Sequence, residues 1–168
     1  MSPSPAVGGT QRVARIWPSE ILRMLSVEKV IPKLLAKVHE IYPDFRDRWN
    51  EHLQYWGDQE RGLYTDMMEF AHYLVDTAVS GRTHGFGPIF ELVEKLIVEG
   101  DEEAKGLLVV GLIETLQTAS PNRKTSDLLR RHLGIHSLLG WLEVEKQWEG
   151  KRNLADVIRE EKRKSSGK

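Results

Sequence analysis

The sequence predicts an all-α fold: a single-domain bundle of about seven or eight helices, loosely HEAT-like in its succession of antiparallel helix pairs. Three observations lead to this prediction. Apolar residues recur every three or four positions through most of the chain. Glycine, proline or a capping residue interrupts each such segment. The 168 residues, 40% of them hydrophobic, suit one domain with a sizeable core.

The central element is expected within residues 88–118, which form two helices joined by one turn. Pro88 suits the first turn of a helix, and Gly100 would end that helix in a left-handed conformation. Asp101 is a natural N-cap for the second helix. The second helix is apolar almost all round, so we expect it to be buried on most sides. A short buried strand is the rival interpretation of its Leu-Leu-Val-Val run at 107–110.

Four helices are expected before this stretch, after a disordered tail over residues 1–15 that is rich in proline, glycine and serine. Asp44 is a plausible cap for the third of them, and Gly57 and Gly81 would end the third and the fourth. The helices are a short one after Pro18 and longer ones over residues 28–41, 45–56 and 63–80. The single helical domain is predicted to span residues 16–160.

Three further helices are expected after Thr118. Ser126 would cap the first, which ends at Gly134. The second covers residues 136–149 and ends at Gly150, and Asn153 caps the last. Residues 161–168 are predicted to be a basic, frayed tail.

Composition excludes several classes of function. The chain has no cysteine, so disulfides, thiolate zinc sites and cysteine nucleophiles are excluded. It has no apolar run long enough to span a membrane and no secretory signal, which fits a cytoplasmic protein that does not act at a membrane. No Gly-x-Ser-x-Gly elbow is present, and no other catalytic set can be assembled. We therefore expect no catalytic residues, no cofactor and no enzymatic activity.

Charge is distributed unevenly along the chain. Residues 28–118 contain 17 acidic and 9 basic side chains, whereas residues 119–168 contain 7 acidic and 12 basic ones. Such a field steers partners of opposite charge, although the two regions could equally neutralise each other within the fold. The short basic run 162–164 is more typical of a solvated tail than of a nucleic-acid site, so direct nucleic-acid binding is not expected.

Two further motifs are weak candidates for ligand sites. Glu69 and His72 form a Glu-x-x-His pair, but di-iron bundles need two such motifs, so no metal site is predicted. The glycine-rich loop 81–87 lacks the Gly-Lys-Ser/Thr ending of a phosphate-binding loop, and no strand precedes it.

A partner-binding surface is predicted on the helix over residues 63–80. Four of its residues lie at spacings of 3, 4 and 3, opposite the apolar face, so they share one face that we expect to be open to solvent. The preceding loop would extend this acidic patch, and a tryptophan at a helix end could anchor a partner. An ordinary solvated helix face is the alternative. The residues predicted to bind a partner are Trp56, Asp58, Glu60, Asp66, Glu69, Tyr73 and Asp76.

Three segments resemble a known family. They are FRDRWNEHLQYW at 45–56, LYTDMMEFAHYLVD at 63–76 and FELVEKLIVEGDEEAKGLLVVGLIETLQ at 90–117. The resemblance covers roughly residues 30–150 and is to small helical immunity proteins encoded beside bacterial polymorphic or contact-dependent toxins. It implies a protein that binds and blocks a cognate toxin by steric occlusion. An acidic middle region would suit a basic toxin such as a nuclease.

Two other classes of function remain open from the sequence. One is a HEAT-like adaptor or regulatory domain that binds another protein. The other, less favoured, is a metal-dependent helical-bundle enzyme built around Glu69 and His72.

Overall fold

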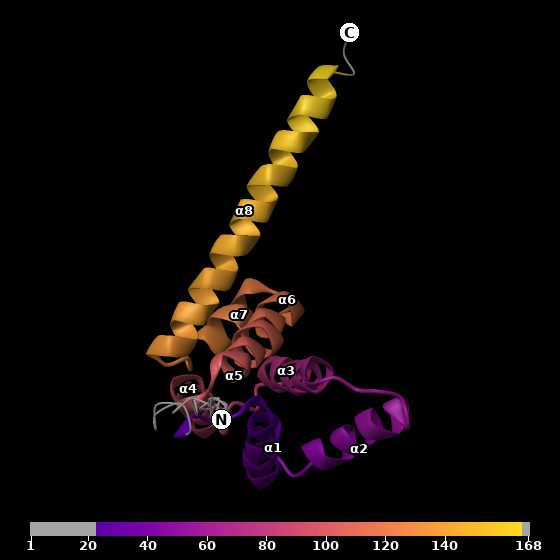
Figure 1. The fold of residues 1–168 in the computed structure, drawn as a ribbon, viewed down its shortest axis with the longest axis vertical. Coiled ribbons are helices and arrows are strands. Elements are labelled where there is room, and N and C mark those ends of the chain that lie inside the picture. The colour runs from indigo at the N-terminus through magenta and orange to yellow at the C-terminus, as the bar shows by residue number, and fades with distance from the viewer. Residues whose placement is uncertain (1–22, 166–168) are drawn as a thin grey trace, which may run out of the picture.

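The computed structural model describes residues 23–165, and the part of the chain that it describes is helical with no β-strand (Figure 1). This confirms the all-α bundle, with seven helices when the continuous run 102–119 is counted as one. The tail predicted over residues 1–15 and the helix predicted after Pro18 lie largely outside the described residues. The elements are η2 (Val27–Lys29), α1 (Val30–Ile41), α2 (Phe45–Trp56), α3 (Leu63–Val79), α4 (Phe86–Glu99), α5 (Glu102–Gly106), η3 (Leu107–Glu114), α6 (Thr115–Ala119), α7 (Arg123–Arg130) and α8 (Ile135–Ser165).

Residues 102–119 form the central helix of the bundle, as the sequence predicts. The rival interpretation of residues 107–110 as a buried strand was therefore wrong. α5, η3 and α6 follow one another without a break, and η3 is a π-helical segment. Gly111 of η3 faces α3, where a Cβ atom would lie 3.0 Å from Met67 Cγ. On α8, a Cβ atom at Gly140 would lie 3.1 Å from Val109 Cγ2. The central helix therefore packs between α3 and α8, with a glycine at each close approach.

Replacing Gly111 by leucine should lower the free energy of unfolding by about 1–3 kcal/mol, because the added side chain overpacks the contact with Met67. Urea denaturation of the variant would measure this loss. Val110→Leu is the matched control, since Val110 lies in the same segment but is 49% exposed. Equal midpoints for the two variants would contradict the close packing of η3 against α3.

The junction between α4 and α5 confirms one expectation and corrects another. Asp101 caps α5, with its Oδ1 accepting from the Ala104 N–H at 2.8 Å. Gly100 is extended (φ −72°, ψ 151°) and not left-handed, because it pairs with Leu25 in an isolated parallel bridge. A Cβ atom there would lie 2.7 Å from the Leu96 carbonyl oxygen, so space and not φ requires glycine.

Three other helix boundaries differ from the prediction. α4 begins at Phe86, two residues before Pro88. Asn122 and not Ser126 caps α7, because Asn122 Oδ1 accepts from the Thr125 N–H at 3.0 Å. α8 runs unbroken through Gly150 and Asn153 to Ser165, so the predictions of a break at Gly150 and of a separate last helix after Asn153 were wrong.

α8 has a packed half and a projecting half. Trp141 is 1% exposed and Val144 is buried against the body, whereas every residue from Lys146 to Glu160 is exposed. Figure 1 shows the C-terminal part of α8 extending well away from the other helices. We call residues 150–165 the projecting half of α8.

Glu94 of α4 fastens the start of α8 to the body. Its Oε2 accepts from the Ser137 N–H at 2.9 Å and from the Ser137 hydroxyl at 2.7 Å, and its Oε1 accepts from the His136 N–H at 2.8 Å. Gly134 leaves room for this carboxylate, since a Cβ atom there would lie 2.5 Å from Glu94 Cδ. Burial by itself would raise the pKa of Glu94, but these hydrogen bonds outweigh it and lower the pKa to about 2.

Stability should therefore fall between about pH 4.5 and pH 2, as Glu94 takes up a proton and loses these bonds. A lowered folded-state pKa contributes stability above the unfolded value of 4.5 and loses it as the pH falls through the folded value. The shift sets an upper limit of about 3 kcal/mol, and solvent near the carboxylate reduces this to about 1–2 kcal/mol. The measurement is denaturation of wild type and Glu94→Gln across this range, with Glu91→Gln on the exposed face of α4 as control. A constant difference between wild type and Glu94→Gln would contradict the prediction.

Candidate functional site

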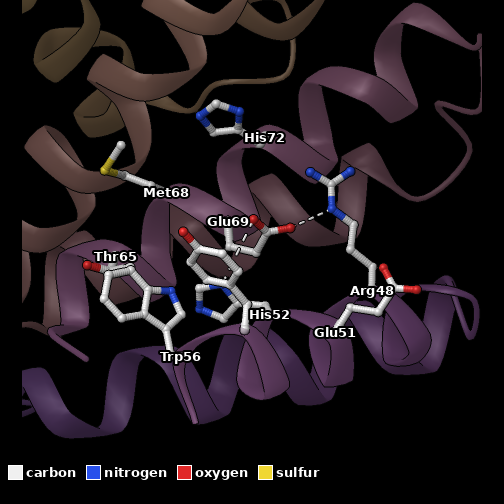
Figure 2. A pocket seen from close by; sticks show the side chains of 9 residues that line it. Arg48, Glu51, His52, Trp56, Thr65, Met68, Glu69 and His72 are labelled. Atoms are coloured by element: carbon white, nitrogen blue, oxygen red, sulfur yellow. Dashed lines mark hydrogen bonds and ion pairs between the residues drawn. The ribbon is translucent and has the colours of Figure 1, made fainter. Parts of the chain in front are cut away.

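An open groove of about 730 Å³ lies between α2 and α3, hereafter the α2–α3 groove (Figure 2). Figure 2 shows Trp56, Thr65 and Met68 toward one end and Arg48 and Glu51 toward the other. The lining residues are Arg48, Glu51, His52, Tyr55, Trp56, Thr65, Met68, Glu69 and His72.

The buried residues of α2 lie in its first half. Phe45 and Trp49 are buried there. The centroid of the Phe45 ring lies 4.4 Å from that of Tyr73 and 6.1 Å from that of Phe70. The second half of α2 leads to Gly57, whose φ of 51° turns the chain into the exposed loop before α3. Figure 1 shows α2 lying at the edge of the molecule.

The polar end of the groove is held by ion pairs that cross from α2 to α3. Arg48 Nε donates to Glu69 Oε1 at 2.5 Å, and its Nη1 donates to Asp76 Oδ2 at 2.6 Å. Burial alone would lower the pKa of Arg48, but the bonds to these two carboxylates raise it, so the guanidinium stays charged. The arrangement fixes α2 against α3 and leaves no cation or carboxylate of this set unpaired.

A second polar cluster lies beneath the groove. His52 Nε2 is 2.8 Å from Asp66 Oδ1, and because a carboxylate only accepts, this nitrogen carries the proton. Arg61 Nε also donates to Asp66 Oδ1. His52 Nδ1 is 4.0 Å from Glu69 Oε2, which links the two clusters. The carboxylates on this face of α3 are thus neutralised from within the chain.

The predicted acidic face of α3 is therefore not open to solvent, and that expectation was wrong for two of its four members. Asp66 is 7% exposed and Tyr73 is 4% exposed. Glu69 is half-buried beneath Arg48, and Asp76 is exposed but paired with the same arginine. The helical spacing places these residues on one face correctly, but it does not reveal that α2 covers that face.

The other three predicted residues remain accessible. Trp56 lines the groove and is half-buried, and Asp58 and Glu60 are exposed in the loop that follows α2. Sequence reasoning missed Tyr55, which is 81% exposed, and Met68, which is 47% exposed. Tyr55 and Met68 fall outside the apolar stripes of their own helices. This position in the sequence pattern would have predicted that both side chains are exposed.

The groove as a whole has the composition of a protein-binding surface. Tyrosine, tryptophan and arginine are the residue types most often found at binding hot spots, and methionine adapts to varied partners. Tyr55, Trp56, Met68 and Arg48 bring all four types to one groove.

The structure offers little support for a metal centre at Glu69 and His72. In the part of the chain described, no three histidine, aspartate or glutamate side chains are grouped so as to hold a metal ion. Glu69 is already engaged by Arg48. The glycine-rich loop 81–87 is likewise occupied, because the Tyr42 hydroxyl donates to the Arg82 carbonyl at 2.6 Å and accepts from the Gly85 N–H at 3.0 Å.

Comparisons with known proteins identify a family but not a function. None of the helices in residues 23–165 combines the length and apolarity that a membrane crossing requires. No curated protein and no solved structure matches the chain. A family described as a domain of unknown function, DUF7674, matches residues 35–149, which include the whole α2–α3 groove and end where α8 starts to project. This match covers more than half of the sequence, and the chain belongs to the DUF7674 family.

Proposed function

We propose that this protein is a non-enzymatic binding domain that neutralises a cognate bacterial toxin by steric occlusion, and that the toxin contacts the α2–α3 groove. The observation that carries the proposal is the exposed aromatic end of the groove, where Tyr55 and Met68 project beside Trp56. The resemblance of three segments to immunity proteins supplies the class of partner. We propose the cytoplasm as the place of action, which fits a cysteine-free chain.

The charge around the groove supports a basic partner. Residues 44–80, which contain α2, the loop and α3, carry eight acidic and three basic side chains. A nuclease toxin would present a basic surface, since its substrate groove must attract phosphate. Complementary charge speeds association and suppresses wrong partners, while the aromatic anchors supply affinity. The internal ion pairs hold the groove in shape before the partner arrives, which lowers the cost of ordering on binding.

The test uses the protein encoded by the neighbouring gene as the probe. Tyr55→Ala combined with Met68→Ala should weaken binding by about tenfold or more, measured by calorimetry, because both side chains are exposed and contribute little to folding. Leu139→Ala is the matched control, since Leu139 is 57% exposed on α8 and lies outside the groove. Unchanged affinity in the groove variant would overturn the groove as the contact surface.

A protection assay in cells, with the same groove variant, distinguishes an immunity protein from the adaptor alternative. An immunity protein must protect cells that express the neighbouring gene product, and the groove variant should lose that protection. Binding without any effect on the partner's toxicity would favour a HEAT-like adaptor or regulatory domain instead.

A further inference from the structure

The projecting half of α8 extends away from the body of the molecule (Figure 1), and its residues 150–160 and 162–164 are all exposed. It also lies beyond residue 149, where the match to the family ends. A single helix of this length is marginal in water, so a partner surface that covered it would stabilise it.

One face of the projecting half is apolar. Leu154, Val157 and Ile158 are 61%, 57% and 47% exposed, and their spacing of three and four residues places them on one face. This is the pattern of an amphipathic helix that binds in a groove of another protein.

The charge of the projecting half favours an acidic surface as its binding partner. Residues 150–165 carry six basic and three acidic side chains, whereas residues 44–80 around the α2–α3 groove carry eight acidic and three basic ones. The two regions lie at opposite ends of the molecule, so within one copy they cannot meet (Figure 1). Between two copies, opposite charge draws the projecting half of one toward the groove of the other.

We propose that the projecting half of α8 from one copy docks in the α2–α3 groove of a second copy. Its apolar face meets the aromatic end formed by Tyr55, Trp56 and Met68, and its basic residues meet the exposed carboxylates Glu51, Asp58 and Glu60 at the groove and in the loop after α2. The lengths agree. The groove follows α2 from Arg48 to Trp56, and the segment from Lys151 to Arg159 has the same number of residues, so each spans about 12 Å of helix.

Self-association of this kind covers the groove that we propose for the partner, so the two should compete. The competition rests on the proposed function, but the self-association does not. Because the projecting half lies outside the groove, its variants separate the two ideas: they should abolish self-association and leave partner binding intact.

The test is analytical ultracentrifugation of the full chain over a range of concentrations, at low and high salt. We expect association that strengthens with concentration and weakens with salt. Leu154→Asp combined with Ile158→Asp should weaken it by about tenfold or more, and so should Tyr55→Ala combined with Met68→Ala. Leu139→Ala serves as control, and circular dichroism checks that each variant is folded.

A mixing experiment identifies the contact itself. The variant with Leu154→Asp and Ile158→Asp keeps an intact groove, and the variant with Tyr55→Ala and Met68→Ala keeps an intact projecting half. An equimolar mixture of the two should therefore restore a one-to-one complex that neither variant forms alone. A chain that stays monomeric at every concentration overturns the proposal. Association that survives in the variant with Tyr55→Ala and Met68→Ala also overturns the proposal, since the projecting half would then bind elsewhere.

Discussion

Asp66→Lys should lower the free energy of unfolding by about 3–5 kcal/mol, the cost of breaking a buried ion pair. The Asp66 side chain is 9% exposed and accepts from both His52 and Arg61. A lysine there would place a new cation beside the Arg61 guanidinium and leave the N–H groups of His52 and Arg61 without an acceptor. Urea denaturation, with tryptophan fluorescence as the signal, would measure the loss.

Asp76→Lys is the matched control, because Asp76 lies on the same helix with a side chain that is 66% exposed. Its pair with Arg48 is at the surface, so the expected cost is about 1 kcal/mol or less. If the two variants were equally stable, Asp66 would have to face solvent, as the helical spacing alone suggests.

Trp141→Ala should also cost about 3–5 kcal/mol, through the cavity that it leaves between α8 and the central helix. Trp141 is 1% exposed, and its Nε1 donates to Glu145 Oε1 at 2.8 Å. Its backbone carbonyl accepts from Gln117 Nε2 at 2.8 Å, which ties α8 to α6.

Chemical denaturation would measure the effect of Trp141→Ala against that of Trp148→Ala. Trp148 lies two turns further along α8 and is 37% exposed, so its removal should cost much less. A larger loss for Trp148→Ala would mean that the contact near Trp148, and not the buried contact of Trp141, holds α8 in place.

Local signals made much of the fold predictable. The helix over residues 45–56 has the predicted bounds because Phe45 and Trp49 repeat at helical spacing and Gly57 ends the run. Asp101 caps the central helix because a short acceptor side chain at that position needs only its own backbone neighbours. Both features depend on a few adjacent residues, which a sequence displays directly.

Errors arose where one local rule competed with context. Gly150 costs an exposed helix only about 1 kcal/mol relative to alanine, which is too little to break α8. Asn153 caps a helix only if the chain has already left the helical conformation, and nothing forces it to do so.

The candidate site depends on how two helices pack together, which the pattern of a single helix does not reveal. A helical wheel correctly places Asp66 and Tyr73 on one side of α3, but whether that side faces water depends on where α2 lies. The crossing pair between Arg48 and Glu69 joins residues 21 positions apart, and no periodicity in either helix encodes it. Likewise the groove is formed by two helices together, so Tyr55 and Met68 become neighbours only after folding.

The π-helical segment of the central helix bears on how the length of this chain varies among relatives. A π turn accommodates more residues than the α-helix on either side of it. Loss of one residue within Leu107–Glu114 leaves enough chain for the segment to return to α spacing, so the flanking residues keep their neighbours. The same loss within α3 would rotate all later residues of that helix by about 100° and turn Leu74 away from the core. Insertions and deletions inside the bundle should therefore collect at the π segment, and an alignment of relatives should place its gaps there.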